Sequence, residues 1–200
     1  MKRRAALKML GVTAAGAVAA TAGGLAWLKH QLSSADVLVQ NLRPGTMDAL
    51  GLDTATLRAL NPRLVYCSLW AYGHKGPMHL HPGYEPMMQA FSGIFSVNGG
   101  PEGQGSRVGL SVLDLGTGLW TALGCIAALL RRETTGEGGV VDTSLFETAL
   151  AWLNVNLTSF QVNGGEDDHL KPLPFRGGVG VGVLRLALRL LDSPHPRPLP

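Results

Sequence analysis

The sequence has little of what marks several classes of protein. Only two of its 200 residues are cysteines, Cys67 and Cys125, and both lie in apolar stretches, which favours packing roles over a disulfide framework. Charged residues make up 16% and the net charge is +3, so the balance favours neither a disordered chain nor a nucleic-acid partner. The six histidines show no metal-ligand spacing, and no metal site is predicted.

Residues 1–30 differ in composition from the rest of the chain. Lys2, Arg3 and Arg4 precede an Ala/Gly-rich apolar run, and the triplet 20–22 (ATA) offers small residues for cleavage. This pattern is typical of a twin-arginine export signal. The alternatives are a short membrane anchor or a segment foreign to the domain. The run is weakly hydrophobic for a spanning helix, and membrane contact is expected only if residues 1–30 act as an anchor.

The next stretch has the pattern of an α/β fold. Residues 36–40 (DVLVQ) and 64–69 (LVYCSL) are β-branched or apolar runs, as in buried parallel strands. Between them, residues 47–60 read as two short helical segments, the second beginning near Asp53. Strand, helix and strand in this order predict a βαβ unit with a parallel crossover.

Residues 107–132 (RVGLSVLDLGTGLWTALGCIAALLRR) are the most informative stretch. A strand-like apolar approach leads to a single carboxylate, Asp114, then to two glycines, Gly116 and Gly118, and to a long apolar helix. Asp114 has two interpretations. It is either an N-cap, or a catalytic carboxylate that the positive helix end keeps ionised and that the glycines leave open to a substrate.

Further elements flank this stretch. Residues 84–91 predict a helix, residues 140–143 a short strand and residues 145–161 a helix that Ser144 caps. Residues 164–200 form a Gly/Pro-rich tail that is expected to be poorly ordered.

Several successive motifs then resemble one family. The stretches ADVLVQNLRPGTMDALGL, LNPRLVYCSLWAYGHKGP, PGYEPMMQAF and RVGLSVLDLGTGLW keep the order and spacing of the family III CoA-transferases, also called CaiB/BaiF proteins. The resemblance covers about residues 34–163. It implies a partial Rossmann-like large domain of the α/β class, with parallel strands and a long central helix after Asp114.

The resemblance also implies a chemistry. Asp114 matches the family's catalytic aspartate, which attacks an acyl-CoA thioester to form an aspartyl acyl anhydride. Two segments match residues that contact coenzyme A in relatives: Asn41, Leu42 and Arg43, and then Pro82, Gly83, Tyr84 and Glu85. Coenzyme A and acyl-CoA are thus implied as substrates, with a carboxylic acid as acceptor and no permanently bound cofactor.

Departures from the family pattern limit this expectation. Racemase relatives carry a histidine where this chain has Tyr84, which disfavours racemisation because a tyrosine with a pKa near 10 is a poor acid/base at neutral pH. Relatives are about twice as long, so a fragment with weak or no activity is expected. The resemblance also implies a cytoplasmic location and, in full-length relatives, an interlocked homodimer. The alternatives are an exported or membrane-tethered non-enzymatic protein and a racemase-like enzyme.

Overall fold

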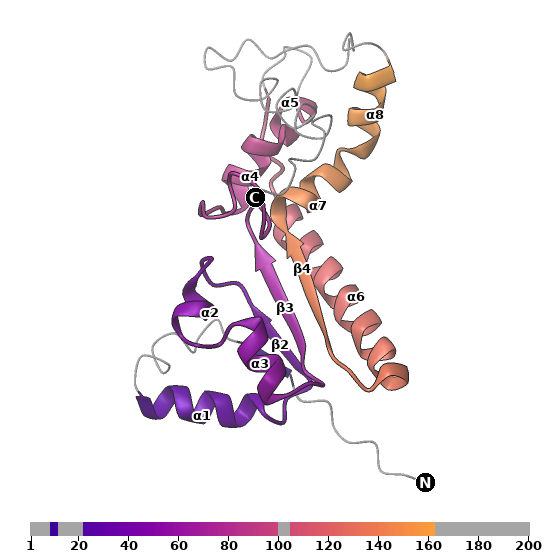
Figure 1. The fold of residues 1–200 in the computed structure, drawn as a ribbon. Coiled ribbons are helices and arrows are strands. Elements are labelled where there is room, and N and C mark those ends of the chain that lie inside the picture. Colours follow the sequence, from indigo (N-terminus) through magenta and orange to yellow (C-terminus); the bar gives the residue numbers. More distant parts are fainter. Residues whose placement is uncertain (1–8, 12–21, 100–104, 163–200) are drawn as a thin grey trace, which may run out of the picture. The chain divides into compact units, whose positions relative to one another are not determined.

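The chain folds into two compact units, each built from separate segments. The fold is given by a computed structural model that describes residues 9–11, 22–99 and 105–162. The first unit comprises Met1–Pro82 with Leu115–Leu145, and the second comprises Gly83–Asp114 with Phe146–Pro200. Figure 1 labels most of the elements of both units.

The first unit contains a sheet of four parallel strands. They are β1 (Met9–Gly11), β2 (Val37–Gln40), β3 (Val65–Trp70) and β4 (Gly139–Ser144), in the order β1-β2-β3-β4. Their extended apolar runs match the expectation for buried parallel strands. The predicted α/β class and the parallel βαβ unit from β2 to β3 are confirmed.

Two short helices connect β2 to β3, as expected. α2 (Thr46–Ala49) follows Gly45, whose φ of 82° is a left-handed conformation that glycine adopts without a steric penalty. α3 (Thr54–Leu60) begins after Asp53, whose carboxylate accepts a hydrogen bond from the Thr56 N–H at 2.9 Å. This is an N-cap, and it starts the helix where the sequence predicted.

Side chains of the strands alternate between two apolar clusters. Leu38 and Tyr66 pack with α1 (Ala22–Leu32) and α3 on one face of the sheet. Val37, Val65 and Cys67 point to the other face, where they pack with α6 (Val112–Thr135). Helices thus cover both faces of the sheet, as its apolar strands require.

α6 turns its large apolar side chains outward. Five of them are more than half exposed and lie on one face: Leu115, Leu119, Leu123, Ile126 and Leu130. The buried face instead carries small or polar side chains such as Thr117, Thr121 and Cys125. The long apolar helix after Asp114 was predicted correctly, and the face that packs on the sheet is the one with small and polar side chains. α6 is also long and apolar enough to cross a membrane. This is weak evidence for a membrane span, because core helices of soluble proteins meet the same two criteria.

The second unit is helical in the residues that the structure describes. It contains α4 (Glu85–Ser92), α5 (Ile94–Val97), α7 (Leu145–Trp152) and α8 (Asn154–Val162), and the rings of Phe91 and Phe146 meet edge to face at 5.5 Å. Two expectations need correction. Residues 106–111 form no strand before α6, and the single helix expected over 145–161 is interrupted at Leu153. Asn154 follows the interruption, and asparagine favours helix ends over helix interiors.

Of the two terminal segments, only the N-terminal one falls partly within the described residues. β1 lies within the signal-like segment 1–30 and pairs in parallel with β2. α1 begins in the same segment, and its Leu28 and Leu32 are buried in the core of the first unit. The Gly/Pro-rich tail 164–200 lies outside the described residues.

Arg132, near the end of α6, joins three parts of the first unit. Its guanidinium contacts the Asp36 carboxylate at 2.8 Å and donates to the Arg63 carbonyl at 3.0 Å. The Arg132 side chain is only 7% exposed, so this ion pair is screened weakly by water.

Replacing Arg132 by methionine is expected to lower the free energy of unfolding by about 2–3 kcal/mol, because the Asp36 carboxylate loses a buried ion pair and the Arg63 carbonyl loses a hydrogen bond. The matched control is Arg58→Met, since the contact of Arg58 within the described residues is an exposed ion pair to Glu137 at 3.9 Å, and its loss should change stability by under about 0.5 kcal/mol. Urea unfolding followed by circular dichroism measures both. Equal effects of the two substitutions would contradict this role of Arg132.

Candidate active site

The candidate site lies at the start of α6, where a buried carboxylate caps the helix. Glu85 is the first residue of α4 and is 4% exposed. Its Oε1 accepts the Leu113 N–H at 3.1 Å and its Oε2 accepts the Asp114 N–H at 2.6 Å. Glu85 therefore satisfies two backbone donors that a helix start leaves unpaired, and it does so from another helix.

Gln89, one turn along α4, holds the segment that leads to α6. Its side-chain amide donates to Glu85 Oε1 at 2.6 Å and to the Leu110 carbonyl at 3.2 Å. Its Oε1 accepts the Val108 N–H at 2.9 Å. Gln89 is fully buried, so this network connects α4 to Val108 and Leu110 in the segment that leads to α6.

Asp114 is the third residue of α6, and its side chain is exposed. The N-cap interpretation is therefore wrong, because Asp114 lies inside the helix and Glu85 provides the capping oxygens. Within the described residues no hydrogen bond reaches the Asp114 carboxyl oxygens. The structure thus holds the backbone of this residue in place and leaves its carboxyl group uncommitted.

The electrostatics at Asp114 differ from those expected. Partial removal of the carboxyl group from water, and then the nearby Glu85 carboxylate, raise the pKa of Asp114 above its ordinary value. The helix start does not offset this, since its N–H groups of Leu113 and Asp114 already bind Glu85. Gly116 and Gly118 lie inside α6, where N–H groups are paired along the helix. They are not free donors, although a Cβ at Gly118 would meet no atom within 4 Å.

This pKa shift gives a prediction for stability. Because the folded chain holds the Asp114 proton more tightly than the unfolded chain, ionisation of Asp114 opposes folding. Asp114→Asn should therefore raise the melting temperature slightly at pH 7, and the gain should vanish as the pH falls below about 4, the unfolded value. The effect is expected within about 0.5 kcal/mol because the residue is exposed. Thermal unfolding from pH 3 to 8 tests this, and a gain that grows towards low pH would contradict it.

The residues just before Glu85 are more exposed to solvent than Glu85 itself. Pro82 is exposed and Gly83 is half-buried. Tyr84 precedes α4 and is 65% exposed, so its ring does not pack in the core. The structure brings Glu85 next to Asp114 and leaves the Tyr84 ring free to contact a ligand.

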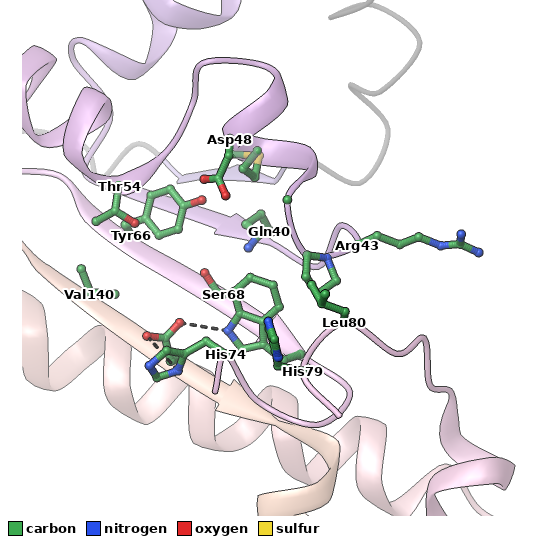
Figure 2. Close-up of a pocket in the computed structure, with 15 residues that line it drawn as sticks. Gln40, Arg43, Asp48, Thr54, Tyr66, Ser68, His74, His79, Leu80 and Val140 are labelled. Carbon is green, nitrogen blue, oxygen red and sulfur yellow. Dashed lines mark hydrogen bonds and ion pairs between the residues drawn. The ribbon is translucent and has the colours of Figure 1, made fainter. Parts of the chain in front are cut away.

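The other predicted contact segment follows β2 in the first unit. Asn41 and Arg43 are exposed, and the Leu42 N–H donates to Gln40 Oε1 at 2.9 Å. In Figure 2 the Arg43 guanidinium points away from the neighbouring side chains, and among the described residues it makes no ion pair. Its charge is thus available to an anion.

The turn borders a pocket of about 360 Å³ that the sequence did not reveal. The pocket lies on one face of the sheet, and it is lined by Gln40, Ser68 and Asp142, which are register neighbours on β2, β3 and β4. Asp142 accepts from the Trp70 indole at 3.0 Å and lies 3.7 Å from the His74 ring, as Figure 2 shows. Polar residues within largely apolar strands, such as Ser68 and Asp142, were the signal available in the sequence.

A buried phenol closes the floor of this pocket. Burial, and then the carboxylates of Asp48 and Asp142, raise the pKa of Tyr66 to about 12. Tyr66 therefore remains a neutral hydrogen-bonding group at physiological pH. Among the described residues, no three His, Cys, Asp or Glu side chains gather where they could hold a metal ion.

Comparison with known proteins assigns this arrangement to a family. The model of CoA-transferase family III matches residues 19–172, which is more than half of the chain. The chain belongs to CoA-transferase family III. The matched range begins inside the signal-like segment and ends inside the Gly/Pro-rich tail.

Individual relatives agree with this family. The chain is 40% identical over 143 residues to an acetyl-CoA:oxalate CoA-transferase of Acetobacter aceti, covering 71% of this chain and 37% of that protein. It is 40% identical over 134 residues to an acyl-CoA transferase of Fusarium pseudograminearum, covering 63% and 29%. The chain thus spans about a third of the length of these curated relatives.

Solved structures support the same fold. A CaiB/BaiF family protein from Brucella suis matches with a TM-score of 0.71 and 32% identity, over 74% of this chain and 39% of that one. The predicted resemblance to family III CoA-transferases is confirmed.

Proposed function

We propose that Asp114 is the nucleophile of a CoA-transferase reaction between an acyl-CoA and a carboxylic acid. The observation that carries the proposal is that the backbone and the carboxyl group of Asp114 have different environments at the start of α6. Buried Glu85 fixes the Asp114 backbone, while the Asp114 carboxyl is exposed and accepts no hydrogen bond from the described residues. A carboxylate that is not hydrogen-bonded and whose pKa is raised is more nucleophilic than one held by donors.

The reaction proceeds as two acyl transfers. The Asp114 carboxylate attacks the thioester carbonyl, the C–S bond breaks, and an aspartyl acyl anhydride and CoA thiolate result. The thiolate then attacks the aspartyl carbonyl, releasing the donor acid as a carboxylate and leaving CoA on Asp114 as a thioester. An acceptor carboxylate reverses these two steps, so that no proton and no external oxidant is consumed.

Other residues of the proposed site bind rather than react. We assign Glu85 a positioning role through its hydrogen bonds to α6, in place of direct contact with CoA, because its two oxygens are already engaged. Tyr84, with Pro82 and Gly83, offers an exposed surface for the thioester arm. Asn41, Leu42 and Arg43 would contact the nucleotide part, where the free Arg43 guanidinium can pair a phosphate.

The remaining assignments rest on the family. The substrates proposed are CoA thioesters of short carboxylic acids with a carboxylate acceptor, in the cytoplasm, with a homodimer as the functional state. Several relatives are named for such substrates, among them a succinate–glutarate CoA-transferase of Agrobacterium fabrum.

The experiment that tests the proposal is capture of the covalent intermediate, which needs a donor but no acceptor. The purified 200-residue chain is incubated with acetyl-CoA or succinyl-CoA and its intact mass is measured. A CoA adduct that hydroxylamine removes, mapped by peptide sequencing to Asp114, is the expected result. An adduct on another residue, or none with either donor from a chain shown to be folded, would refute the proposal. Turnover with an added acceptor is expected to be weak.

A further inference from the structure

The only two cysteines of the chain meet in the core of the first unit. Cys67 lies on β3 and Cys125 on α6, and their Sγ atoms are 2.9 Å apart. Carbon atoms in van der Waals contact are about 3.5–4.0 Å apart. Because sulfur is larger than carbon, the two thiols are in direct contact. The proposed transfer reaction uses neither of them.

The close approach of α6 to the sheet brings these sulfurs together. Gly124 precedes Cys125, and a Cβ at this glycine would lie 2.6 Å from Val141 Cγ1 on β4. Only a residue without a side chain allows the helix to lie this close. The groups around the two thiols are apolar: Val37, Val65, Val39, Ala128, Leu129 and Val141. Among the described residues this cluster contains no charged or metal-binding side chain, and the Asp142 carboxylate acts on the Cys67 thiol only as the last of the causes that raise its pKa.

We infer that Cys67 and Cys125 form an intramolecular disulfide, joining β3 to α6, when the chain meets a small-molecule disulfide oxidant such as oxidised glutathione. A disulfide bond is about 2.05 Å long, so the sulfurs need to approach by less than about 1 Å. The first thiol loses its proton and attacks the oxidant, releasing one glutathione thiolate. The second thiol, deprotonated in turn, displaces the other glutathione, so one disulfide is reduced as one forms.

The burial of the two thiols determines how fast the disulfide forms in the folded chain and in the refolding chain. Burial, and then the neighbouring Cys125 thiol, raise the pKa of the Cys67 thiol well above its ordinary value, and the thiolate is the reactive form. Cys67 is fully buried and Cys125 is 7% exposed, so an oxidant as large as glutathione reaches neither sulfur without local opening. The bond should form fast while the chain refolds and at least about tenfold more slowly in the folded chain.

The disulfide would stabilise the fold. The two cysteines are 58 positions apart in the sequence, so the bond closes a long loop in the unfolded chain. A loop of this size predicts a rise in melting temperature of about 10 °C for a chain of this length.

The test compares the full chain refolded from urea with reduced or with oxidised glutathione. The expected product under oxidation is a monomer lighter by two hydrogens, in which the peptides of Cys67 and Cys125 are linked. It should keep the circular dichroism of the reduced chain and melt about 10 °C higher. Cys125→Ala is the control, because it removes the partner and should leave glutathione attached to Cys67 or no modification at all.

Other products would overturn the inference. A chain carrying two glutathiones or a disulfide-linked dimer as the main product means that the sulfurs do not pair within one chain. A linked monomer that melts lower than the reduced chain means that the folded state does not accommodate the bond. If Cys125→Ala fails to fold, Cys67→Ala serves in its place, and the mass of the oxidised wild-type chain still decides.

Discussion

Replacing Asp114 by asparagine is expected to abolish the covalent CoA adduct, with a loss of at least about 1000-fold in its rate of formation. The amide is a poor nucleophile, and the change leaves the shape of the side chain and the backbone contact to Glu85 intact. Peptide mapping after incubation with acetyl-CoA measures the adduct. Since asparagine can revert slowly to aspartate by deamidation, Asp114→Ala is examined alongside it.

Glu133→Gln is the matched control for this prediction. Glu133 lies near the other end of α6, and its side chain makes an exposed ion pair to Arg63 at 3.9 Å in the part of the chain that the structure describes. Its neutral variant should label at the wild-type rate. If both carboxylate variants lose the adduct equally, or Asp114→Asn retains it, the assignment of the nucleophile fails. The stability of Asp114→Asn at pH 7 excludes unfolding as the cause of a loss.

Replacing Glu85 by alanine is expected to lower the free energy of unfolding by about 3 kcal/mol. The substitution leaves the N–H groups of Leu113 and Asp114 without the Glu85 acceptor and also removes one acceptor of the buried Gln89 amide. Hydrogen bonds to a charged group are worth about 1.5–3 kcal/mol each when one partner is removed. Urea unfolding measures the loss, and Glu137→Ala, at an exposed glutamate, should change stability by under about 0.5 kcal/mol.

Hydrogen exchange separates a capping role for Glu85 from a general packing effect. In Glu85→Ala the amides at the start of α6 should exchange faster than in the wild type, while those of β3 should change only with global stability. Glu85→Gln should give an intermediate loss of stability. Its amide oxygen can accept one of the two backbone N–H groups, but its NH₂ group is a donor and cannot accept the second. Unchanged exchange at residues 113 and 114 would contradict the role assigned to Glu85.

The sequence predicted those elements that local patterns determine. β2 and β3 were visible as β-branched runs, and α3 was visible from Asp53, whose capping bond spans three positions. The importance of the Asp114 region was also visible, through its motif. Each of these signals lies within one element or its immediate neighbours.

Features that depend on distant residues were missed. The cap of α6 comes from Glu85, 29 positions before the Asp114 N–H that it binds, and no local pattern marks such a partner. The contact of Cys67 with Cys125 spans 58 positions. The outward leucines of α6 show a related limit, since apolar spacing identifies a helix face but not what packs on it.

The pairing of β3 with β4 has a consequence for how the protein is made. Thr143 on β4 donates to the Ser68 carbonyl on β3, 75 positions earlier in the chain. At a synthesis rate of about 5–20 residues per second, roughly 4–15 s pass between the synthesis of β3 and that of its partner strand β4. During that interval one edge of a largely apolar strand has unpaired backbone groups, which is the condition that recruits chaperones or nucleates aggregation. Yield in cells should therefore depend on translation speed between residues 70 and 139 more than on the stability of the finished fold.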